Sequence, residues 1–207
     1  MTRDQITADL DYASALARDG ENTPLLGGPI GLLWGVLLTL VFAGQWAILS
    51  GTAGLPKQSL MYLWLAYAII GSIGTFVLGR KIDAKPGSSS TANRVESYVW
   101  TMFAGAMATL FVGVVLNMLL SGGTPALYDM LVVFGFAGQG IAYGVVAKMT
   151  KQGRMHLASF MCFAVSALCF SVYGDVVIYL IAALGAVVTI VWPSLMTMSK
   201  ETSATGS

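Results

Sequence analysis

Long apolar stretches separated by short polar segments make up most of this chain. Six of them approach or exceed the roughly 20 residues needed to cross a hydrocarbon core of about 30 Å: 29–50, 59–79, 96–120, 125–147, 155–173 and 175–196. Each should be an α-helix, because an open chain in lipid would leave its backbone N–H and C=O groups unpaired. The pattern predicts an all-α polytopic membrane protein with about six transmembrane helices, for which three sequential helical hairpins are a suitable arrangement.

The polar segment 1–23 precedes the first apolar stretch. Ile6, Leu10, Ala13 and Ala17 recur at helical spacing, and Gly20 follows them as a stop signal. This indicates a short amphipathic helix, whose acidic polar face differs from the basic face of helices that lie on anionic lipid. It could dock on this protein's own helix ends or on another protein. The six-helix domain would then cover 24–198, with 199–207 as a polar tail.

Charge supports the membrane assignment and orients the chain. Only 10% of residues are charged and 56% are apolar, whereas a soluble domain carries roughly 25% charged residues. The net charge of +1 provides no broad field suited to nucleic acid. Lys57 is the one basic residue on one side of the predicted spans. The other ten fall in segments on the opposite side: Arg3, Arg18, Arg80, Lys81, Lys85, Arg94, Lys148, Lys151, Arg154 and Lys200. By the positive-inside rule both termini are cytoplasmic, and this counting suits a bacterial inner membrane best.

Small and polar residues recur every fourth position along the third predicted span, across the whole membrane. The series is Thr101, Gly105, Thr109, Gly113 and Asn117. Small residues in lipid allow helix backbones to approach closely, and hydroxyl or amide groups can bond across helices. The series therefore indicates a helix-packing seam. Its alternative is the wall of a polar path.

Two glycine runs have the same kind of spacing. Gly27, Gly31 and Gly35 begin the first span, and Gly140 and Gly144 lie on the fourth. Such elements favour helix association, and within six helices most should pack internally. The run on the first span is the candidate for a face between chains, because it begins at the periphery.

Carboxylates mark two further candidate features. Asp129 and Asp175 fall at the outer ends of the fourth and sixth spans, where they could form an outer cation vestibule, and Asp175 can also cap its helix. Asn93 and Glu96 have the spacing of a cap for the third helix.

Chemistry that would indicate an enzyme or an ion-coupled pump is not recognisable in the sequence. No Asp, Glu, Lys, Arg or His falls near the middle of a predicted span, where proton- and ion-coupled transporters place them. His156 is the single histidine, and there is no zinc-type Cys/His cluster. We therefore expect no enzymatic activity, no cofactor and no metal.

The sequence-level hypothesis is a non-enzymatic membrane subunit, scaffold or regulatory component that acts through helix–helix contacts. Its expected partners are membrane lipids and either further copies of itself or another membrane protein, and no nucleic acid. The alternative is a channel or facilitator for a small neutral solute or cation, because hydroxyls and carbonyls can line a pore without charged residues.

Overall fold

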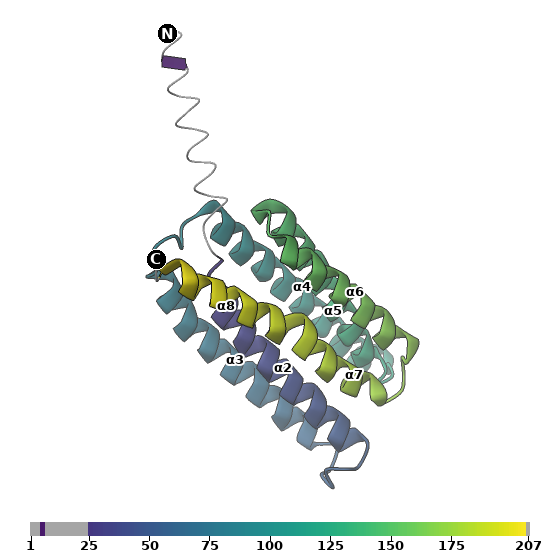
Figure 1. Cartoon of the computed structure of the whole chain (residues 1–207). Coiled ribbons are helices and arrows are strands. Elements are labelled where there is room, and N and C mark those ends of the chain that lie inside the picture. Colours follow the sequence, from purple (N-terminus) through teal and green to yellow (C-terminus); the bar gives the residue numbers. More distant parts are fainter. Residues whose placement is uncertain (1–4, 7–24, 206–207) are drawn as a thin grey trace.

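The computed structural model describes residues 5–6 and 25–205, with side chains described as far as Ser199. Six helices within these residues are long and apolar enough to cross a membrane, as predicted (Figure 1). They are α2 (Gly28–Leu49), α3 (Ser59–Asp83), α4 (Thr91–Ser121), α5 (Leu127–Thr150), α6 (Gly153–Ser171), and a sixth span made of α7 (Val177–Ala186), the π-helical turn η1 (Val187–Val191) and α8 (Trp192–Thr205). The predicted amphipathic helix in 1–23 lies outside the described residues, except that Gln5 and Ile6 are helical.

Helix ends differ from the predicted ends where polar residues continue a helix. α4 begins at Thr91 rather than at Glu96, and its N-cap is Ser90, whose hydroxyl accepts the Asn93 N–H at 3.3 Å. The prediction that Asn93 and Glu96 cap this helix is therefore wrong. α8 continues to Thr205 through most of the predicted tail.

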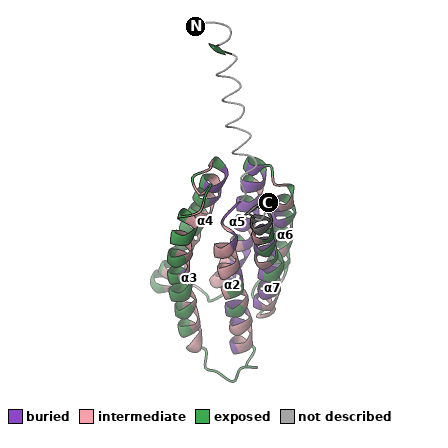
Figure 2. Ribbon diagram, turned by 60° about the vertical axis from the view of Figure 1, so that its left-hand side comes forward, coloured by how far each residue is buried: buried purple, intermediate pink, exposed green. Residues whose placement is uncertain are grey.

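The helices pack in an order that differs from their order in the chain. α3 packs on α2, α2 packs on the sixth span, α6 lies against the sixth span and α5, and α5 packs on α4. The hairpins α2–α3, α4–α5 and α6–α7 are each internally packed, and contacts of α5 with α6 and of α2 with α7 join them. α3 and α4 come at the two ends of this packing order, and Figure 2 shows how much of their surface is exposed.

Two apolar clusters fill the bundle, one toward each end. We call "basic end" the end at which α3 and α5 finish and α4 and α6 begin; it carries Arg80, Lys81, Lys85, Arg94, Lys148, Lys151 and Arg154. The cluster near it includes Leu25, Tyr143, Val146, Met155 and Cys162. The cluster toward the opposite end includes Phe42, Phe136, Cys169, Ile178 and Tyr179.

A local change of helix type in the sixth span has a chemical cause. Proline lacks an N–H and its ring clashes with the carbonyl four residues earlier, and Pro193 lies two residues after Val191, the last residue of η1. The Trp192 N–H bonds the Val187 carbonyl, five residues back, in the π pattern. The fully buried Thr189 lies in this turn and donates its hydroxyl to the Gly185 carbonyl at 2.9 Å.

Candidate functional site

The glycine run of α2 packs inside the chain, against the sixth span. A Cβ added to Gly31 would come within 2.5 Å of Ser194 Oγ, and one added to Gly35 within 2.9 Å of Val191 Cγ2. A Cβ on Gly28 would meet Met198 at 2.8 Å. α2 and the sixth span therefore approach closely. An added Cβ would force neighbouring side chains to move, and at Gly28 and Gly35 it would also lie 3.1–3.3 Å from backbone atoms. The surface proposed from sequence as a face between chains is covered by this chain's own helix.

Gly27, the first member of that run, contacts α4. Its N–H donates to Glu96 Oε2 at 3.2 Å, and the adjacent Leu26 N–H donates to Asn93 Oδ1 at 2.8 Å. Glu96 thus pairs the N–H of Gly27, the N-cap residue of α2, whose N–H has no intrahelical partner. Asn93 pairs the N–H of the residue before it, so the two side chains join the start of α4 to the start of α2.

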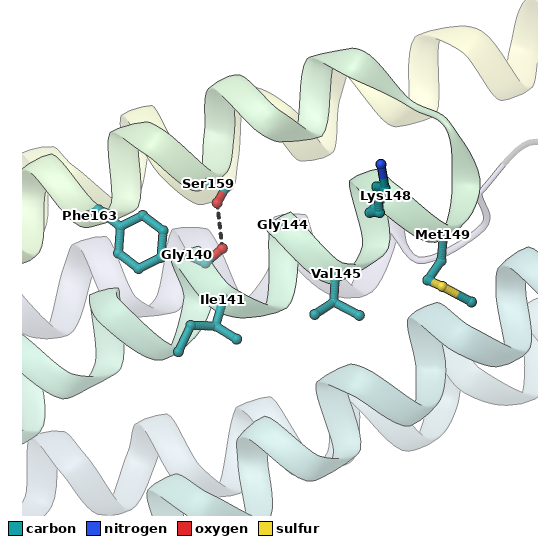
Figure 3. A pocket seen from close by; sticks show the side chains of 8 residues that line it. All are labelled: Gly140, Ile141, Gly144, Val145, Lys148, Met149, Ser159 and Phe163. Carbon is teal, nitrogen blue, oxygen red and sulfur yellow. Dashed lines mark hydrogen bonds between the residues drawn. The ribbon is translucent and has the colours of Figure 1, made fainter.

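The glycines of α5 form a second internal seam, against α6. A Cβ on Gly140 would lie 2.9 Å from the Phe163 ring, and one on Gly144 would lie 3.2 Å from Ser159 Oγ. The Ser159 hydroxyl donates to the Gly140 carbonyl at 2.6 Å (Figure 3). Ser166 donates to the Val133 carbonyl at 2.8 Å in the same way. Serine hydroxyls thus link α6 to the backbone of α5.

The stripe on α4 has the opposite environment. Thr101, Gly105, Thr109, Gly113 and Asn117 are all exposed. A Cβ added to Gly105 or Gly113 would meet no atom within 4 Å. The Thr101 and Thr109 hydroxyls donate to the carbonyls of Ser97 and Gly105, four residues earlier, at 2.8 and 2.9 Å. The stripe is therefore a smooth surface that faces away from the bundle, and its hydroxyl donors are already satisfied.

The two outer carboxylates have separate roles. Asp129 is buried and accepts hydrogen bonds from the Tyr179 hydroxyl at 2.5 Å and from the Gly174 N–H at 3.1 Å. It thereby fixes the α6–α7 turn. Asp175 is exposed, and its Oδ1 accepts the Val177 N–H at 2.9 Å at the start of α7. Asp129 is thus largely used within the fold, and Asp175 caps a helix.

Further polar groups occupy the interior. Gln45 is buried and accepts the Trp64 indole N–H at 2.8 Å, which links α3 to α2. The bond from Tyr179 to Asp129 links α7 to α5. Gln139 differs, because its Oε1 is buried without a hydrogen-bond partner in the described part of the chain.

Sequence reasoning missed two features of these sites. The contact of Glu96 with Gly27 joins residues 69 positions apart, so no local pattern could reveal it. Lys148 continues the Gly140 and Gly144 series at the same spacing of four, and this signal was available in the sequence. An open groove of about 430 Å³ lies along this line of α5.

Metal chemistry has no candidate centre here: no group of three or more His, Cys, Asp or Glu side chains comes together among the described residues. Three comparisons with known proteins give the same result. No protein-family model, no curated protein and no solved structure matches this chain.

Proposed function

We propose that this protein is a non-enzymatic membrane subunit that binds another transmembrane helix, from a second copy or from another membrane protein, on the outer face of α4. One observation carries the proposal. In an apolar 18-residue stretch of α4 no residue is buried, and in that of α3 only 6% are, whereas half of the residues are buried in the corresponding stretch of α5. A span that packs so little within its own chain, and bears small residues along its outer face, is suited to packing with a neighbour.

The physical basis is the absence of a hydrophobic driving force in lipid. Helices associate there through close van der Waals contact and interhelical hydrogen bonds, and small residues permit the close approach. The open space over Gly105 and Gly113 leaves room for a partner backbone. The threonine hydroxyls are bonded within α4, so binding would leave no unpaired donor among them.

The test replaces Gly105 and Gly113 together with leucine and measures the mass of the complex extracted from the native membrane in mild detergent. The expected result is loss of the partner or of the second copy, because the leucines fill the surface. Gly79→Leu is the matched control, since Gly79 is also a helical glycine with nothing within 4 Å of its Cβ position. Unchanged assembly in the α4 double variant contradicts the proposal.

A second candidate function, a facilitator for a small neutral solute, is favoured by one specific observation. The unpaired buried Oε1 of Gln139 is an acceptor that a permeating donor could use. The test is flux of glycerol and urea into liposomes that contain the protein. We expect flux above that of empty liposomes, and a loss of this flux in Gln139→Leu. Flux equal to that of empty liposomes would contradict the facilitator hypothesis.

We also propose a bacterial inner membrane as the location, with both termini in the cytoplasm. The support is the charge distribution, because the basic end collects the lysines and arginines of two inter-helix connections while Lys57 lies in the connection after α2. The positive-inside rule places such an end in the cytoplasm. Reaction of a cysteine at position 57 with an impermeant thiol reagent in intact cells tests this, and reaction at position 85 instead reverses the orientation.

A further inference from the structure

A groove lies on the outside of the bundle between α5 and α6, near the basic end (Figure 3). Its volume of about 430 Å³ is within the range of small-molecule sites. Gly140 and Gly144 form part of its floor, while Ile141, Val145 and Phe163 are among its apolar walls. At this floor α5 and α6 lie close together, because a Cβ on Gly140 would already lie 2.9 Å from the Phe163 ring.

The polar groups of the floor are already paired. Ser159 is buried, and its hydroxyl donates to the Gly140 carbonyl at 2.6 Å. The exposed side chains around the floor are aliphatic or aromatic: Ile141, Val145, Met149 and Phe163. The groove therefore suits a hydrocarbon chain better than a polar solute.

One end of the groove is charged. Lys148 lines it, is exposed and lies in the last turn of α5, four residues beyond Gly144. A lysine there can keep its apolar stem along the groove and its ammonium at the level of the lipid headgroups. Basic pockets between transmembrane helices at such a level bind anionic headgroups.

We propose that this groove binds one acyl chain of an anionic phospholipid, with the headgroup paired to Lys148. The charge of Lys148 selects an anionic headgroup, and the apolar walls select a lipid rather than a free anion. The site lies on α5 and α6, so it is independent of the proposed function of α4.

The experiment uses the full chain, purified in detergent and depleted of lipid, with native mass spectrometry as the readout. The probes are phosphatidylglycerol and phosphatidylcholine with identical acyl chains. One ammonium near an anionic headgroup is worth about 1 kcal/mol, or about fivefold in affinity. We expect the wild type to prefer phosphatidylglycerol about fivefold, Lys148→Gln to lose this preference, and Val145→Trp to reduce binding of both lipids by filling the groove.

The control variant is Lys81→Gln, which removes an exposed lysine at the basic end that does not line this groove. It should keep the full preference. Equal losses of the phosphatidylglycerol preference in Lys148→Gln and Lys81→Gln would contradict the proposed site and show that the preference comes from the summed charge of the basic end. Displacement of the lipid by inorganic phosphate overturns it in favour of a free anion. A change of oligomeric state in Val145→Trp without a change in lipid binding overturns it in favour of a helix partner.

Discussion

The glycine run of α2 and the stripe of α4 share a sequence pattern and have opposite environments. A Cβ on Gly31 would come within 2.5 Å of the sixth span, whereas one on Gly105 would meet nothing within 4 Å. Small residues at a spacing of four give a helix a smooth side, and the spacing does not say what covers that side. The difference arises from the packing order, in which α2 lies between α3 and the sixth span while α4 packs mainly on α5.

The largest expected effect comes from filling the covered side. Gly31→Leu together with Gly35→Leu should destabilise the fold by about 2–6 kcal/mol, because overpacking costs about 1–3 kcal/mol for each site and the Val191 backbone N lies 3.1 Å from the Gly35 Cβ position. The measurement is thermal unfolding in detergent, with Gly79→Leu as control. A folded double variant that has lost only its assembly would reverse the comparison and make α2 the face between chains.

Loss of the contact between α4 and the start of α2 should have the next largest effect. Glu96 belongs to the only buried part of α4, together with Ala92 and Asn93. Glu96→Ala leaves the Gly27 N–H without its acceptor, which costs about 1–3 kcal/mol when the group stays buried. Glu96→Gln keeps an acceptor oxygen and should retain most of the stability.

Hydrogen exchange at the Gly27 amide is the sharper measurement for this contact. Exchange should accelerate in Glu96→Ala and stay slow in Glu96→Gln. Thr109→Val, in the exposed part of α4, should leave it unchanged. Equal stability and equal exchange in all three variants would show that α4 needs no anchor on α2.

The sequence predicts the six helices because lipid leaves the backbone no other way to pair its polar groups. It predicts small-residue seams on α2, α4 and α5 for a similar reason, since close backbone approach requires residues without bulky side chains. Which seam is covered depends on the packing order, and that order is set by contacts between distant segments. The hydrogen bond from Gly27 to Glu96 is such a contact. The Ser90 cap is local, and the sequence prediction placed the cap at Asn93 instead.

A third prediction compares the two outer carboxylates. Asp129→Ala should destabilise the protein by about 1.5–3 kcal/mol, the range for a hydrogen bond to a charged group, because Tyr179 and Gly174 both lose their acceptor. Asp175→Ala removes one exposed cap bond and should cost less. A double-mutant cycle of Asp129→Ala with Tyr179→Phe measures the coupling directly. Additive effects of the two substitutions would contradict a structural role for this pair and return Asp129 to the vestibule hypothesis.

The smallest effect on folding is expected on the exposed side of α4. Gly105→Leu with Gly113→Leu should leave the thermal stability of the isolated chain within about 0.5 kcal/mol of the wild type, as for surface substitutions elsewhere, because the added side chains meet no atom of the chain. The same substitution type at Gly31 and Gly35 is expected to destabilise the fold strongly. Comparing the two double variants therefore shows whether each glycine series is covered by this chain's own helices. If the α4 variant unfolds as readily as the α2 variant, α4 is covered by its own chain in the membrane. If it stays folded and loses its partner, the difference between the two glycine patterns is the difference between a core and an interface.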